Sequence, residues 1–189
     1  MFSKHSESGL ARIKYLYKMK GIDLYIPISS FQVISLINQD NILKNYLVQE
    51  FQTGKKYTAK SLNIISKNFQ VKIEDYLLRE FKIINNLFSK LFFKFHWFCS
   101  EDFNFENYPV IITDELYSKT LLDFIKDHNY PINFSLTKKL INIYGIALAF
   151  IIIHNFFQIN ADIKLESIYE TDDFYPKIDF FSFLKREFS

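Results

Sequence analysis

Short apolar runs separated by turn signals fill the first part of the chain, and this pattern is typical of β-strands. Aromatic and β-branched residues are concentrated in five segments that we predict to be strands: residues 29–37, 44–51, 54–63, 90–100 and 108–116. The turn "QTGK" between the second and third carries Gly54, as a hairpin requires. We therefore expect a β-rich half.

A helical period interrupts this pattern once and then replaces it. Between residues 72 and 90 the apolar positions recur at spacings of three and four, which predicts an amphipathic helix. A short helix is predicted at 119–128 and a long one at 135–157, with Ser135 as its N-cap. A small hairpin that turns at residues 172–173 closes the chain. The pattern predicts an α+β protein.

The long helix leads into an unusually uncharged segment. Residues 140–161 contain no Asp, Glu, Lys or Arg, and a segment of that length can cross a bilayer. However, Asn142 and His154 interrupt it, and its strictly apolar part, residues 143–153, has the length of a buried core helix. We favour the core helix and keep a small membrane-associated protein as an alternative.

Composition and charge exclude several classes of protein. The chain has 189 residues, enough for one domain, and a net charge of +2, which does not favour binding to nucleic acid. A single cysteine, Cys99, cannot form an internal disulfide and fits a reducing compartment, so we expect a cytoplasmic protein. Residues 1–27 lack the apolar core of a signal peptide and form an N-terminal extension.

Several short motifs occur in a suggestive order along these elements. They are "YTAK" (57–60), "PVIITDEL" (109–116), "INADIKLESIY" (159–169) and "YPKIDFFSFLK" (175–185). In this order, and on these elements, they resemble the motifs of the eukaryotic protein kinases, and a lysine at position 164 resembles the serine/threonine branch.

The resemblance implies a fold and a division of the chain. It implies a β-rich N-lobe with one αC-like helix at 28–112, a hinge at 113–117, and an incomplete helical C-lobe at 118–189. Together these form a partial kinase-like domain over 28–189, which ends just after the position of the metal-binding loop.

The same resemblance implies a nucleotide site that binds ATP. Lys60 would pair with the α- and β-phosphates, and Glu80 would hold that lysine in place. Thr113 would be the gatekeeper, with Asp114, Glu115 and Leu116 presenting backbone groups to the adenine. Without the resemblance, Lys60 is a solvated lysine on an edge strand and Glu80 a surface carboxylate.

Catalytic and magnesium-binding residues are implied near the end of the chain. Asp162 would accept the proton of the attacking hydroxyl, and Lys164 would steady the γ-phosphate. Ser167 stands where the family has a magnesium-binding asparagine. Asp179 precedes the position of the metal-binding aspartate by one residue, although a local slip would align Asp179 and Phe180 with that motif.

Three departures from the family lead us to expect impaired catalysis. The phosphate-covering stretch, residues 38–43, has no glycine, and Asp40 adds a negative charge there. Ser167 has replaced a magnesium ligand, and losing ~4 kcal/mol of metal stabilisation would slow transfer roughly a thousandfold. The resemblance also stops at Ser189.

These departures favour a pseudokinase or decayed fragment that acts at most as a nucleotide- or protein-binding module. The alternative is an active serine/threonine kinase with a non-standard metal site. Because the incomplete C-lobe would leave apolar surface near residues 151–153 uncovered, we also expect a protein partner on the long helix.

Overall fold

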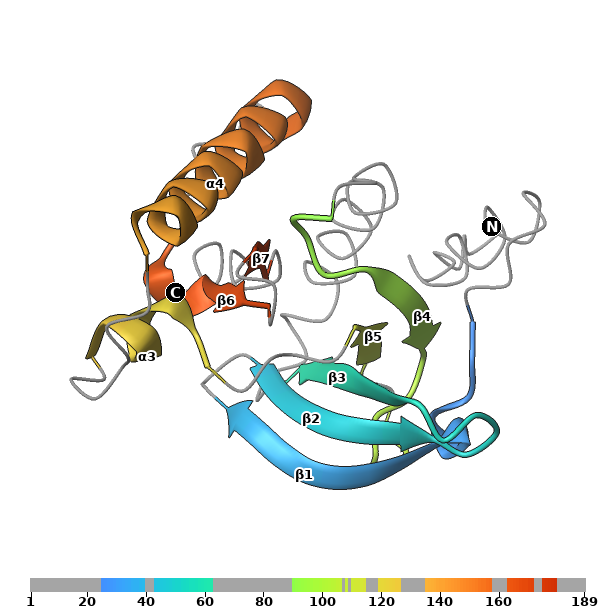
Figure 1. Cartoon of the computed structure of the whole chain (residues 1–189). Helices are drawn as coiled ribbons and strands as arrows, with labels where there is room; N and C mark the ends of the chain where they lie inside the picture. The colour runs from blue at the N-terminus through green and yellow to red at the C-terminus, as the bar shows by residue number, and fades with distance from the viewer. Residues whose placement is uncertain are drawn as a thin grey trace, which may run out of the picture. The chain divides into compact units, whose positions relative to one another are not determined.

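The computed structural model describes much of the chain as two compact units (Figure 1). Unit 1 comprises Met1–Asn86 and Lys94–Glu115, and unit 2 comprises Leu87–Phe93 and Leu116–Ser189. The structure describes residues 25–39, 43–62, 90–106, 108, 110–114, 119–126, 135–157, 163–171 and 175–179. The helix predicted at 72–90 lies outside these residues apart from its last position.

Unit 1 is built on a five-stranded antiparallel sheet with the order β1-β2-β3-β5-β4. After the short 3₁₀ helix η1 (Ile28–Ser30), its strands are β1 (Phe31–Gln39), β2 (Leu43–Glu50), β3 (Lys56–Leu62), β4 (Phe95–Cys99) and β5 (Val110–Thr113). The five predicted strands are confirmed, and β1, β2 and β3 lie side by side in Figure 1.

The tight turn between β2 and β3 depends on Gly54. Its φ of +69° lies in the left-handed region, where a side chain would be strained. The Gly54 N–H donates to the Glu50 carbonyl at 2.9 Å, and the Gly54 carbonyl accepts a hydrogen bond from Gln49 Nε2 at 2.7 Å. The turn therefore fixes the β2–β3 register, in which Tyr46 faces Ala59.

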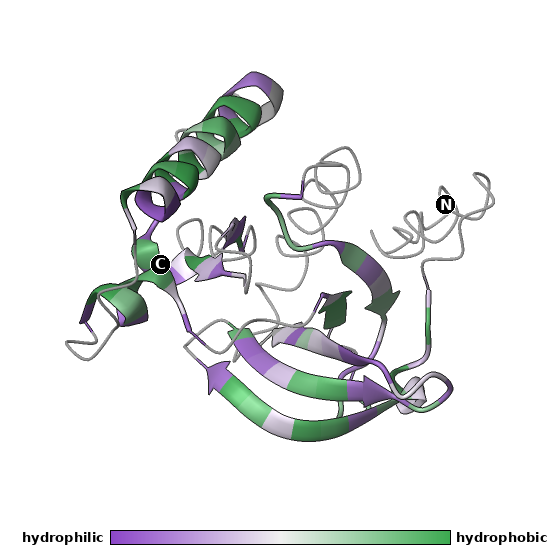
Figure 2. Ribbon diagram, in the orientation of Figure 1, coloured by the Kyte–Doolittle hydropathy of each residue, from purple (hydrophilic) through white to green (hydrophobic). Residues whose placement is uncertain are grey.

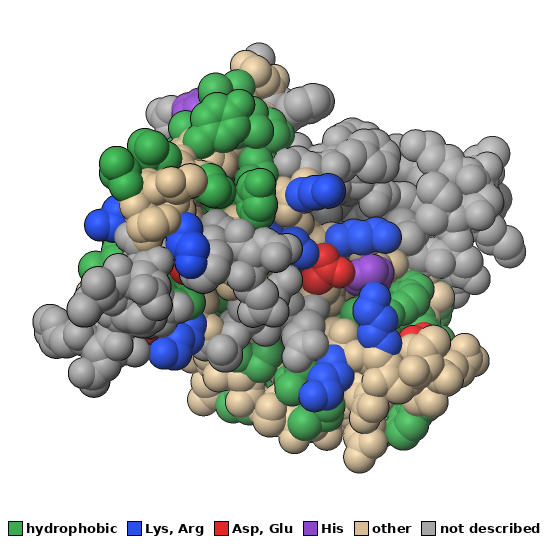
Figure 3. Space-filling model, in the orientation of Figure 1, with side chains coloured by type: hydrophobic (Ala, Val, Ile, Leu, Met, Phe, Trp, Pro, Cys, Tyr) green, Lys and Arg blue, Asp and Glu red, His purple; other side chains and the backbone are tan. Residues whose placement is uncertain are grey.

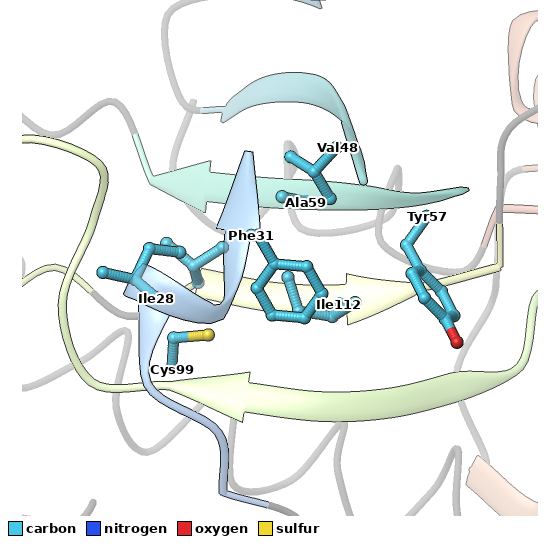
Figure 4. Packing of buried hydrophobic residues seen from close by; sticks show 8 residues of the cluster. Ile28, Phe31, Val48, Tyr57, Ala59, Cys99 and Ile112 are labelled. Carbon is cyan, nitrogen blue, oxygen red and sulfur yellow. The ribbon is translucent and has the colours of Figure 1, made fainter. Parts of the chain in front are cut away.

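One face of this sheet carries the apolar core of unit 1 (Figure 4). The rings of Phe31, Tyr57 and Trp97 make edge and tilted contacts with centroids 5.0–6.2 Å apart. The buried members of this cluster are Ile28, Phe31, Val48, Tyr57, Ala59, Cys99, Val110 and Ile112. Fully burying one of the larger aliphatic side chains contributes about 1.5–3 kcal/mol. Burial also raises the pKa of the Cys99 thiol to about 12, so Cys99 is a core residue and not a nucleophile.

In its described residues, unit 2 combines two helices with a small hairpin. Its elements are α3 (Leu121–Lys126), α4 (Leu136–Phe157), the 3₁₀ helix η2 (Leu165–Ser167), β6 (Ile168–Glu170) and β7 (Pro176–Ile178). The strands pair in antiparallel register with Ile168 opposite Ile178, and Phe92 forms a parallel bridge to Ile178. The predicted strand at 90–100 was therefore too long, because its first residues pair with β7 and β4 begins only at Phe95.

Both helices of unit 2 begin at side-chain caps. Ser135 Oγ accepts a hydrogen bond from the Lys138 N–H at 3.3 Å, which confirms the predicted N-cap of α4. At α3, Thr120 Oγ1 accepts from the Asp123 N–H at 3.2 Å, and Asp123 Oδ2 accepts from the Thr120 N–H at 2.8 Å. The hydrogen bonds that the N–H and the hydroxyl of Thr120 donate to Asp123 Oδ2 lower the pKa of Asp123.

Helix α4 has one buried face and one exposed face. Apolar residues occur all along it in Figure 2, yet Leu140, Ile143 and Tyr144 are exposed while Ala149 and Ile153 are buried. Its segment Leu136–Asn155 is long and apolar enough to cross a membrane by length and composition.

A close contact fixes α4 against β7 at Gly145. A Cβ atom added there would stand 2.6 Å from Pro176 Cγ and 3.3 Å from Leu91 Cδ2. We expect Gly145→Ala to lower the free energy of unfolding by about 1–3 kcal/mol through overpacking. At an open helical position the same change would add about 1 kcal/mol. Urea unfolding measures the difference.

The double variant Gly145→Ala/Pro176→Ala is the control for this clash. Shortening the proline side chain removes the contacting atoms, so we expect part of the loss to be recovered relative to Pro176→Ala alone. A Gly145→Ala protein more stable than the parent would contradict the packing of α4 on β7.

Candidate functional site

Lys60 lies at the centre of the unit 1 sheet and is 1% exposed. Its cross-strand neighbours are Asn45 on β2 and Ile111 on β5. Because side chains alternate along a strand and Ala59 belongs to the apolar core, Lys60 lies on the opposite face of the sheet. A buried lysine is almost always paired, so Lys60 is not the solvated edge residue of the simpler interpretation.

Thr113, the predicted gatekeeper, lies on the same face as Lys60. Thr113 is opposite Thr58, and directly opposed residues of an antiparallel pair share a face, as do Thr58 and Lys60 two positions apart. Thr113 is fully buried, and its hydroxyl donates to the Asp114 carbonyl at 3.1 Å. The structure thus brings two of the predicted nucleotide-site residues onto one buried face. Glu80, Glu115 and Leu116 lie outside the described residues.

Asn45 is a third polar residue on this face, and sequence reasoning missed it. It is 9% exposed, and its Nδ2 donates to Asn38 Oδ1 at 2.7 Å. Among the residues that the structure describes, its buried Oδ1 has no hydrogen-bond partner. Such an atom costs about 1–3 kcal/mol. The sequence could have indicated Asn45, because it is a polar residue on the same face of the strand as the apolar residues Leu43 and Leu47.

Asp114 anchors the end of β5 to β4. Its Oδ1 lies 2.7 Å from His96 Nε2, its Oδ2 accepts from the Lys94 N–H at 3.1 Å, and its own N–H donates to the Lys94 carbonyl at 2.9 Å. The carboxylate therefore joins the end of β5 to the start of β4. Asp114 lies within the predicted hinge.

In unit 2, the two residues predicted to bind magnesium are brought together. The Asp179 N–H donates to the Ser167 carbonyl at 2.8 Å, and both residues are buried. Lys164 is exposed, and its carbonyl accepts from the Ser167 N–H at 2.9 Å. Asp162 lies outside the described residues. A carboxylate and a hydroxyl are oxygen ligands of the kind magnesium uses. Among the residues that the structure describes, no group of three or more His, Cys, Asp or Glu could hold a metal ion.

A buried carboxyl group that the sequence did not reveal connects β6 to α4. Glu170 Oε1 accepts a hydrogen bond from Asn142 Nδ2 at 3.1 Å, and Asn142 Nδ2 also donates to the Lys138 carbonyl at 3.2 Å. Within the described part of the chain, Glu170 Oε2 is buried and has no hydrogen-bond partner. Burial raises the pKa of Glu170, and the hydrogen bond from Asn142 and the charge of Lys138 only partly oppose this effect.

Comparison with a solved structure identifies the fold. The structure of the apo pseudokinase GRMZM2G135359 matches the chain with a TM-score of 0.64 and 16% sequence identity, covering 78% of this chain. The chain has a protein-kinase-like fold. The predicted fold class is confirmed: the sheet of unit 1 corresponds to a kinase N-lobe, and unit 2 to part of a helical C-lobe.

The kinase-like fold is shared at low sequence identity and over part of a domain. No protein-family model and no curated protein sequence matches the chain. The chain spans 56% of the length of the pseudokinase chain that it matches. The likeness thus establishes the fold alone, and the serine/threonine character, the roles of the site residues and the predicted lobe boundaries stay predictions.

The Glu170 carboxyl makes stability depend on pH. Because its folded pKa is raised above the ordinary value of 4.5, its favourable contribution is fully present below pH 4.5 and is lost as the pH rises through the folded pKa. We expect Glu170→Gln, a neutral analogue, to gain stability relative to the parent protein across this window. Urea unfolding at pH 4, 6 and 8 measures this difference.

Glu166→Gln is the matched control, because Glu166 is an exposed glutamate in the adjacent η2. Its free energy of unfolding should stay within about 0.5 kcal/mol of the parent at each pH. A constant difference between Glu170→Gln and the parent over the whole range would rule out the buried, proton-binding carboxyl.

Proposed function

We propose that the chain is a catalytically impaired protein-kinase-like module that binds a nucleoside triphosphate such as ATP without transferring its phosphate efficiently. The observation that carries this proposal is the buried Lys60 at the centre of a kinase-like sheet, sharing its face with Thr113. A cation fixed on a strand stabilises phosphate oxygens without reorganising when they arrive. The solved structure of similar fold is described as a pseudokinase, which supports the proposal of impaired catalysis.

The chemistry of the predicted phosphate and metal sites supports binding more than catalysis. Residues 38–43 contain no glycine, so side chains occupy a stretch where backbone N–H groups would approach phosphates, and Asp40 adds a repulsive charge. Phosphoryl transfer depends almost wholly on positioning and charge neutralisation. Weak phosphate coverage therefore lowers the rate of transfer more than it lowers binding of the adenine and ribose.

Ser167 and Asp179 are the residues that would hold magnesium, whose role is to neutralise charge on the phosphates. A backbone hydrogen bond makes them neighbours, and a hydroxyl and a carboxylate are oxygen ligands of the kind that magnesium uses. However, Ser167 contributes a neutral hydroxyl, so Asp179 would carry the negative charge of this pair alone. We therefore propose that magnesium adds little to nucleotide affinity.

A thermal-shift experiment with and without magnesium tests nucleotide binding. At an ATP concentration of about 100 times Kd, binding stabilises the folded state by about 2.7 kcal/mol. We expect ATP to raise the melting temperature by similar amounts with magnesium and with EDTA. Lys60→Met, which keeps the bulk of a buried side chain, should abolish the shift. Lys56→Met changes an exposed lysine of the same strand and should leave it intact.

A phosphate-transfer assay distinguishes the proposed binding module from an active kinase. Transfer of labelled phosphate to a generic protein substrate that requires magnesium and is lost in Asp162→Asn would establish the enzyme instead. If ATP produces no shift in either buffer while the Lys60→Met protein stays folded, the chain has the fold without this ligand, and the proposal fails.

A further inference from the structure

The exposed face of α4 is a continuous apolar stripe. Its large side chains are well exposed: Leu136 73%, Leu140 56%, Ile143 63%, Tyr144 71% and Ile151 56%. They lie with the exposed Ala147 at spacings of three and four, so they share one side of the helix. Figure 3 shows hydrophobic atoms gathered at the surface over α4. A stripe of this extent on a soluble domain marks a contact surface.

The other face of α4 already makes contacts within unit 2. Asn142 donates to the buried Glu170 carboxyl group, and Gly145 packs against Pro176. A helix that spans a bilayer presents apolar side chains to lipid on its free sides, but this face carries a polar pair joined to β6. A partner that binds the stripe therefore covers only one side of the helix.

We propose that the stripe is a homodimer interface in which α4 packs antiparallel against α4 of a second copy, around Ala147. A two-fold contact requires that if residue i meets residue j, then j also meets i. With Ala147 on the axis, Ile143 of each copy meets Ile151 of the other, and Leu140 meets His154. The small side chain at the axis allows close approach, and the branched residues on either side fill the space next to it.

The charges at the ends of α4 favour this orientation over a parallel one. Lys139 is exposed in the first turn of α4, whereas the charge of Lys138 acts on the buried Glu170 on the other face, and the stripe carries no carboxylate. In an antiparallel pair the Lys139 side chain of each copy lies near the partner's helix C-terminus, where the helix dipole stabilises positive charge. A parallel pair would instead bring the lysines of both copies together.

The size of the stripe is sufficient for a weak but specific dimer. Five large side chains, each more than half exposed, offer on the order of 500 Å² per copy, or about 1,000 Å² in total, which reaches the lower limit for a biological interface. We therefore expect association at micromolar concentrations and not an obligate dimer.

Cysteine cross-linking in the 189-residue chain tests both the partner and the orientation. The native Cys99 is buried and protonated, so it does not compete. Under a mild oxidant, Ala147→Cys should form a disulfide-linked dimer by itself. Ile143→Cys and Ile151→Cys should cross-link to each other when mixed, and poorly alone, because like positions are separated by about 12 Å along the axis.

Light scattering supplies the second measurement. The parent should show a mass that rises toward a dimer with concentration, and Ile143→Lys should abolish this rise. Ile125→Lys changes an exposed residue of α3 and should leave it unchanged. Self-linking of Ile143→Cys but not of Ala147→Cys would overturn the antiparallel arrangement. A parent that stays monomeric at 100 μM, or that floats with phosphatidylcholine vesicles through the same stripe, would overturn the dimer.

Discussion

Strand β3 must satisfy two different environments at once, and the arrangement of unit 1 depends on this constraint. Tyr57 and Ala59 complete the apolar core on one face, while Thr58 and Lys60 are buried on the other. In the sheet, β3 lies between β2 and β5. The register that fills the core is therefore the register that buries Lys60, since a slip by one residue would exchange the faces.

Unit 2 shows the same combination of apolar packing and a buried polar group. Gly145 lets α4 approach Pro176, and the Asn142–Glu170 hydrogen bond sets which side of the helix faces β6. Polar pairs of this kind help to select one arrangement of an otherwise uniform apolar helix, because another rotation would take Asn142 away from the buried Glu170 carboxyl group. The apolar stripe on the opposite side is a consequence of this choice. One rotation of α4 thus determines both the internal contact and the surface left for a partner.

The two units carry separate groups of candidate residues. Lys60, Thr113 and Asn45 are buried on one face of the sheet of unit 1, whereas Ser167 in unit 2 offers only a neutral hydroxyl. In the function we propose, Lys60 serves nucleotide binding, and the absence of glycine from residues 38–43 limits phosphate transfer. The kinase-like architecture and the composition of the site are separate lines of evidence, because a fold alone does not fix an activity.

The sequence by itself determined the elements and their order. Alternating and helical periods identified the five strands and α4, Ser135 identified a helix start, and the short motifs identified the kinase-like fold, because all of these signals are local. Only the tertiary structure decided which side chains share a face or a bond. The unpaired oxygen of Asn45, the raised pKa of Glu170, the pairing of residues 91–92 with β7 and the exposed side of α4 depend on contacts between distant segments. Periodicity cannot reveal such contacts, because a helix that is apolar on all sides shows no preferred face until its neighbours select one.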